Sequence, residues 1–219
     1  MERTIRVTGT GSVSLKPDIT IITLRMTDVC DKYEDCLEAS VFALNEVKWA
    51  LEKVGINKKD VKTTYFNVDA YYESHYENGI HESIFKGYRY HQTVKFEFDI
   101  DNTLLGKVLY EIGQLSINPE LSINYGIKDV EDAKNKLLSN AVKDAQKKAE
   151  IIANAANVEL DQILDINYSW LDIEFMSRSY DMDVSYCCKS KPETGAYNID
   201  IDPEDIEKRD NITVVYRIK

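Results

Sequence analysis

Four cysteines and three histidines are the side chains of this sequence best suited to nucleophilic, redox or metal-binding chemistry. Cys187 and Cys188 are adjacent, whereas Cys30 and Cys36 flank the predicted start of a helix. Neither spacing matches the C-x2-C pairs of zinc sites, so the sequence predicts no metal site. Free thiols are expected because the start of the chain predicts a reducing, cytoplasmic location. A thiol-based redox sensor or enzyme that uses Cys187 and Cys188 is the alternative function.

The three histidines form no recognisable catalytic arrangement. His75 and His81 bracket Asn78-Gly79, a dipeptide typical of tight hairpin turns, and the expected register puts these histidines on opposite faces. His91 lies on a predicted strand, with no Ser, Cys or Asp at an interpretable spacing for a triad. The sequence therefore predicts no catalytic residues and no cofactor.

A glycine-containing run near the start, Gly9-Thr10-Gly11-Ser12, has the composition of a phosphate-binding loop. Such a loop is followed by Lys-Ser or Lys-Thr and opens a helix, and this run does neither. We expect these glycines instead to mark a strand that bends or that another backbone approaches closely.

Composition limits the classes of function. The formal net charge of −11 argues against nucleic acid or an anionic membrane as a partner. Hydrophobic residues make up 43% and charged residues 30%, which is ordinary for a folded protein. No stretch approaches the roughly 20 apolar residues of a membrane span. Residues 1–7 lead directly into strand-like alternation without an apolar signal region, so the sequence predicts a cytoplasmic location.

Hydrophobic periodicity predicts elements that position these residues. Residues 4–15 and 19–29 are expected to pair as a β-hairpin, and residues 61–100 as a longer hairpin around Asn78-Gly79. A helix between them carries an apolar stripe of Leu37, Val41, Leu44, Val47, Leu51 and Val54. The remaining predictions are helices at 102–115 and 130–156 and strands at 118–128, 162–170 and 206–218.

The predicted fold is α+β and two-layered, with mainly antiparallel sheet and helices on one face. The element order is ββαββ followed by αβαββ. Residues 1–219 are expected to form one unit, with two intertwined lobes of about 1–100 and 101–219 as the alternative. Residues 171–205 are strongly acidic and lack periodicity, which predicts a loop excursion. The last long helix is expected to bury Ala133, Leu137, Ala141, Ala145, Ala149, Ile152 and Ala156.

Tyrosine is enriched, with fourteen in 219 residues. Six of them lie on the 61–100 hairpin, whose register puts Tyr88 and Tyr90 on one face and Phe66, Tyr72 and Phe85 on the other. One face can be covered by the chain's own helix. For the other we predict self-association through Tyr72, Tyr76 and Phe85, since tyrosine is enriched at interfaces. A sheet covered on both faces and a ligand-binding surface are the alternatives.

Several stretches together resemble the SIMPL domain proteins, a family of largely unassigned function. The first is residues 7–13 (VTGTGSV) followed by Pro17-Asp18-Ile19, and the second is Gly87-Tyr88-Arg89. The third is an alanine-rich helix with Asp132-Ala133, Ala141, Asp144-Ala145, Lys148-Ala149 and Ala153. The fourth is the last strand, with Pro203, Ile206, Glu207 and Thr213-Val214-Val215-Tyr216.

This resemblance implies an α+β fold without known catalytic residues. Among relatives, some bacterial proteins are exported and linked to oxidative-stress tolerance, one builds a channel-like ring of identical subunits, and an animal protein is a signalling adaptor. The chain departs from the family by lacking an export signal. It also departs by carrying Glu204, Lys208, Arg209 and Asp210 where glycine and small or apolar residues are usual.

The sequence thus predicts a non-enzymatic, cytoplasmic protein of the SIMPL type. It is expected to act by assembling with itself or with a protein partner, and a role in stress tolerance follows only from the resemblance.

Overall fold

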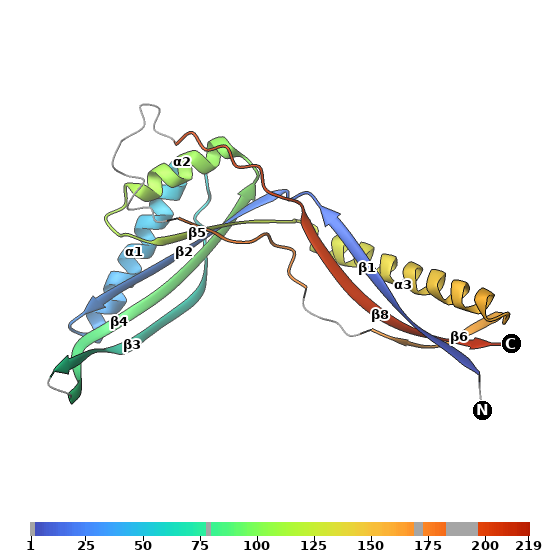
Figure 1. Ribbon diagram of the computed structural model, residues 1–219. Coiled ribbons are helices and arrows are strands. Elements are labelled where there is room, and N and C mark those ends of the chain that lie inside the picture. Colours follow the sequence, from blue (N-terminus) through green and yellow to red (C-terminus); the bar gives the residue numbers. More distant parts are fainter. Residues whose placement is uncertain (1–2, 78–79, 169–172, 183–196) are drawn as a thin grey trace. The chain divides into compact units, whose positions relative to one another are not determined.

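The computed structural model describes residues 3–77, 80–168, 173–182 and 197–219 (Figure 1). The described part has the predicted α+β composition, with antiparallel strand pairing in two sheets. Its elements, in chain order, are β1 (Thr4–Leu15), β2 (Ile19–Cys30), α1 (Tyr33–Lys53), β3 (Lys62–Glu77), β4 (Ile80–Asp99), α2 (Asn102–Gly113), β5 (Glu120–Gly126), α3 (Val130–Ala155), β6 (Leu160–Asn167), β7 (Tyr180–Met182) and β8 (Ile206–Ile218).

The chain divides into two compact units. The α3 unit comprises Met1–Asp18, Gly126–Ser177 and Pro203–Lys219, and the α1–α2 unit comprises Ile19–Tyr125 and Arg178–Asp202. Each unit takes segments from both halves of the chain, so these units do not coincide with lobes of about 1–100 and 101–219.

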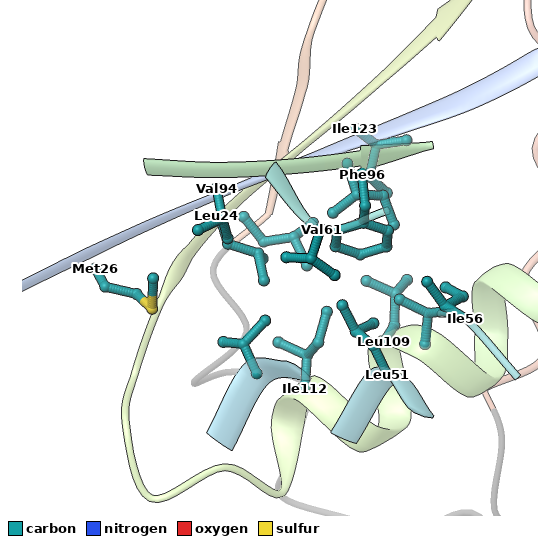
Figure 2. Packing of buried hydrophobic residues seen from close by; sticks show 14 of the residues in the cluster. Leu24, Met26, Leu51, Ile56, Val61, Val94, Phe96, Leu109, Ile112 and Ile123 are labelled. Atoms are coloured by element: carbon teal, nitrogen blue, oxygen red, sulfur yellow. The ribbon is translucent and has the colours of Figure 1, made fainter. Parts of the chain in front are cut away.

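The α1–α2 unit is built on a five-stranded sheet with the order β3-β4-β2-β5-β7. Helices α1 and α2 bury their apolar sides against this sheet, as the period of three to four residues requires. Figure 2 shows the packing, in which Leu51, Leu109 and Ile112 of the helices approach Phe96 of the sheet. All four side chains are at most 4% exposed, so this cluster is the core that supports β4.

The α3 unit is a three-stranded sheet with the order β1-β8-β6, covered on one face by α3. The predicted alanine stripe of α3 is confirmed from Ala133 to Ala149, but Ile152 and Ala156 are exposed and Ala153 is buried instead. Small side chains let the helix approach the sheet closely. An ideal Cβ on Gly9 would lie 2.1 Å from the carbonyl oxygen of Ala141, so the expected close backbone approach is confirmed.

The predicted hairpin of residues 4–15 and 19–29 is wrong. β1 pairs with β8 in the α3 unit, whereas β2 pairs with β4 in the α1–α2 unit. The segment 16–18, which we expected to be a hairpin turn, is the point where the chain leaves one unit for the other. Alternation of apolar side chains predicts that a segment is a strand, but it does not identify the strand's partner.

Strand β1 lies at the edge of its sheet, and side chains of α3 bind its outward-facing backbone groups. An unpaired strand edge can recruit another chain, and such contacts block it. The contacts are Lys148 Nζ donating to the carbonyl oxygen of Thr8 (3.0 Å), the Thr10 N–H donating to Asp144 Oδ2 (2.7 Å) and Asn140 Nδ2 donating to the carbonyl oxygen of Ser12 (3.0 Å).

This edge contact predicts a pH dependence. Hydrogen bonding from Lys148, followed by that from the Thr10 N–H, lowers the pKa of the Asp144 carboxyl. Because the folded-state pKa is lower, the stabilisation is present above the unfolded-state pKa and is lost as pH falls through the folded-state value. Between roughly pH 5 and pH 2, the urea midpoint of Asp144→Asn should therefore fall less than that of the unchanged protein. An identical pH dependence in both proteins would contradict this assignment.

The described part of the acidic segment 171–205 is more structured than the predicted loop. β7 lies within it and pairs with β5, and the Asp181 carboxylate accepts a hydrogen bond from Ser122 Oγ (2.6 Å). Phe175 is 3% exposed and packs with Ala133 and Leu137 of α3. These contacts could not be predicted from the sequence, because single buried residues in an acidic segment produce no periodic pattern. Residues 183–196 of this segment lie outside the described residues.

Candidate functional site

The hairpin of β3 and β4 extends beyond the rest of its sheet. β2 ends at Cys30, which lies opposite Tyr88, so residues 80–87 of β4 pair only with β3. At about 3.3 Å per residue this two-stranded part extends roughly 25 Å past Tyr88. We call residues 72–77 and 80–85 the aromatic arm. Glu77 pairs with Ile80, as predicted for a two-residue turn at Asn78-Gly79, and the turn residues themselves lie outside the described ones.

A series of aromatic rings joins the arm to the body of its unit. The ring centroids of Tyr72 and Phe85 are 5.5 Å apart, and those of Phe85 and Tyr88 are 5.6 Å apart. Tyr88 in turn contacts Tyr33 of α1 at 5.7 Å, and each pair has an edge-to-face geometry. Such geometry is favourable for aromatic quadrupoles. These rings therefore hold the base of the arm against the start of α1.

The ring contacts show that the predicted assignment of side chains to the two faces of the hairpin was wrong. Tyr72 and Phe85 were expected on the face opposite Tyr88, but they lie on the same face. The register shifts between Tyr71 and Tyr72, where Gly87 of β4 has a φ of +122°. One extra residue in β4 reverses the facing of every side chain beyond it. The same shift places Phe66 opposite Gln92 in place of His91, and thus on the Tyr90 face as well, and a second shift near Thr64 returns Lys62 to its place opposite Lys95.

The residues predicted for self-association lie together on this face and are accessible. Tyr72 is 54% exposed, Phe85 49% and Tyr76 67%, and Tyr76 follows Tyr72 by four residues without an intervening shift. The reverse face of the arm is more polar, with Lys86 Nζ 3.3 Å from the Glu73 carboxylate. The arm thus presents one face with exposed aromatic rings and a reverse face that carries Glu73 and the exposed Ile84.

Sequence reasoning missed a second exposed apolar surface, on α1. Val41, Phe42 and Trp49 are 58%, 56% and 61% exposed. Val41 was predicted to point inward, but the helix buries Cys36 and Val47, which lie on its opposite side. Residues seven apart share one side of a helix, so the pair Phe42 and Trp49 was the available signal.

The reverse face of the five-stranded sheet contains a groove of about 540 Å³, which bears on the alternative of a ligand surface. His91 lies in it and hydrogen bonds through Nδ1 to Thr27 Oγ1 (3.1 Å), while its Nε2 is 4.0 Å from the Asp69 carboxylate. His91 is therefore a hydrogen-bonded residue of a strand. The groove is lined by Arg25, Met26, Thr27, Tyr65, His91, Gln92, Thr93 and Glu120.

Several other residues considered for redox or metal chemistry fall outside the described part of the chain. Cys187 and Cys188, the candidates for a redox function, lie outside the described residues, as do the side chains of His75 and His81. Within the described residues, no group of three His, Cys, Asp or Glu side chains is placed to hold a metal ion. None of the helices in the described part is long and apolar enough to span a membrane.

Comparison with known proteins gives one family and two similar proteins. The family model SIMPL, described as "Protein of unknown function (DUF541)", matches residues 5–216. A 26 kDa periplasmic immunogenic protein of Brucella melitensis biotype 1 is 27% identical over 165 residues, and that of Brucella abortus (strain S19) is 26% identical over the same length. Each match covers 74% of this chain and 65% of the relative, slightly under two thirds of the relative's length.

These relatives contradict the predicted cytoplasmic location, because both are named as periplasmic proteins. The prediction was based on the missing apolar signal region in residues 1–7, and the names of the relatives overturn it. The expectation of reduced thiols, which followed from the cytoplasmic location, loses its basis as well.

Proposed function

Since this chain belongs to the SIMPL family, whose members are of unknown function, we propose that it acts by assembling with further copies of itself, or with a protein partner, through the aromatic arm. In this proposal it catalyses no reaction. The observation that carries the proposal is the joint exposure of Tyr72, Tyr76 and Phe85 on one face of a two-stranded ribbon.

Physical reasoning supports an interface at this position. A two-stranded ribbon is only marginally stable in water, and a partner that covers its aromatic face would stabilise it. Tyrosine is favoured in such contacts because its ring is apolar while its hydroxyl can remain hydrated. The rings of Tyr88 and Tyr33 support the base of the arm, so less conformational freedom is lost when a partner binds.

The test is the double variant Tyr72→Ser/Phe85→Ser. If both side chains are central to a contact, each contributes about 2 kcal/mol, and their joint loss raises the dissociation constant roughly 1,000-fold. Light scattering coupled to size exclusion should show a drop in mass, while circular dichroism shows a retained fold. Ile84→Ser, on the other face of the same ribbon, is the matched control and should leave the mass unchanged.

Two results would contradict the interface. A double variant with the mass of the unchanged protein would show that the contact lies elsewhere, and a monomeric mass for the unchanged protein would exclude self-assembly. If the double variant loses its fold, the two rings pack chiefly within their own subunit.

The names of the relatives support a periplasmic location for this protein. In source cells, osmotic shock should therefore release it together with periplasmic marker enzymes. Retention with cytoplasmic markers would refute this location.

A further inference from the structure

Cys30 and Cys36 both lie next to Tyr88 of β4. Cys30 is the last residue of β2 and lies directly opposite Tyr88 in the antiparallel ladder, where paired Cα atoms are about 5 Å apart. Cys36 lies in the first turn of α1, and its Sγ–H donates to the carbonyl oxygen of Tyr88 at 3.1 Å. The short link 31–35 therefore brings the end of a strand and the start of a helix together, and the side chains of Cys30 and Cys36 lie within hydrogen-bonding reach of each other.

The two thiols differ in accessibility. Cys36 is fully buried in the core of the α1–α2 unit, whereas Cys30 is half-buried and packs against the same core. Burial, followed by the effect of the neighbouring Cys36 side chain, raises the pKa of the Cys30 thiol to about 12. At neutral pH the folded protein therefore holds Cys30 almost entirely as the protonated thiol, which is the unreactive form.

We propose that Cys30 and Cys36 form an intramolecular disulfide when the chain encounters a disulfide-type oxidant. This inference goes beyond self-assembly and does not depend on the aromatic arm being an interface. The periplasmic location proposed above bears only on whether such an oxidant is met in the cell.

The chemistry is thiol–disulfide exchange in two steps. The Cys30 thiol loses its proton, and its sulfur attacks an external disulfide, forming a mixed disulfide and releasing one thiolate. Cys36 then loses its proton and attacks the Cys30 sulfur, which closes the protein disulfide and releases the second thiolate. Two protein thiols are oxidised, the external disulfide is reduced to two thiols, and the two protons pass to the released thiolates. In the folded protein Cys30 reacts first, because it is the more exposed of the two.

The environment determines when the bond forms. In the unfolded chain both thiols are hydrated and accessible, so exchange is fast. After folding, thiolate is scarce at Cys30 and Cys36 is covered, so exchange becomes slow. The disulfide should therefore form mainly during folding. It would tie the end of β2 to the start of α1, beside Gly87 and Tyr88 at the base of the aromatic arm.

The experiment uses the full chain with Cys187→Ser/Cys188→Ser, so that only two thiols remain. One sample is refolded from urea with reduced and oxidised glutathione, and a second is first folded under reduction and then given the same mixture. Alkylation and mass spectrometry should show that the refolded sample has lost both alkylatable thiols and about 2 Da of mass. The prefolded sample should react at least tenfold more slowly, and the oxidised protein should melt several degrees higher than the reduced protein.

Peptide mapping without reduction identifies the bond, and the four-cysteine chain is mapped in parallel. A Cys30–Cys36 link in both proteins is the expected result, and Cys36→Ser should stop at a glutathione adduct on Cys30. The proposal is overturned if both thiols remain free after refolding, if Cys30 stays as the glutathione adduct with Cys36 present, or if either cysteine is linked to another chain or to Cys187 or Cys188.

Discussion

Replacing Gly9 with alanine should destabilise the α3 unit by about 3 kcal/mol, at the upper end of the range for overpacked sites. The added Cβ would lie 2.1 Å from the carbonyl oxygen of Ala141 and 2.5 Å from the backbone nitrogen of Ala145. Backbone atoms in the middle of a helix cannot move aside as the end of a flexible side chain can. The helix must therefore shift away from β1, and the contacts of α3 with the sheet loosen. Urea denaturation gives the loss of free energy of unfolding.

Two further variants test whether the close approach is the cause. Ser12→Ala changes an exposed position on the same strand and should alter stability by less than about 0.5 kcal/mol. Removing the methyl group of the facing alanine in Gly9→Ala/Ala145→Gly should not restore stability, since the shortest contact is with Ala141 O. If the double variant were as stable as the unchanged protein, the clash would be with the side chain and the argument from the helix backbone would be wrong.

Replacing Gly87 with alanine should cost roughly 2–4 kcal/mol, because two penalties combine at this position. Its φ of +122° is a conformation that residues with a side chain rarely adopt, and a Cβ there would lie 2.2 Å from the carbonyl oxygen of Cys30. The backbone strain and the clash can be relieved only if the register shift of β4 at Gly87 disappears or moves to another residue. The arm would then turn its aromatic face away from Tyr88, and the near-ultraviolet circular dichroism of the packed rings should decrease.

Gly55→Ala is the matched control for this variant. Gly55 also has a positive φ, of +90°, but an added Cβ would meet nothing within 4 Å. Its replacement should therefore cost only about 1 kcal/mol of backbone strain. Equal losses for the two variants would show that strain alone acts at Gly87 and that the contact with Cys30 contributes nothing.

The candidate site was predictable in its parts. Asn78-Gly79 predicted the hairpin and its pairing at the tip, because this dipeptide adopts the positive φ values that a two-residue turn requires. The excess of tyrosine on that hairpin predicted an aromatic surface. Which face the rings occupy could not be predicted, since alternation is counted along an uninterrupted strand and one extra residue at Gly87 reverses the count.

The sequence by itself determined the α+β class, the long alanine-faced helix and the family, since each of these is recorded in local periodicity or in short ordered motifs. Only the tertiary structure decided that β1 pairs with β8, that Phe175 belongs to the core and that Cys30 and Cys36 share Tyr88. The physical reason is that periodicity reports which side of an element is buried. The partner that buries it is selected by packing between segments distant in the chain, as at Gly9, where only a helix with small side chains can approach so closely.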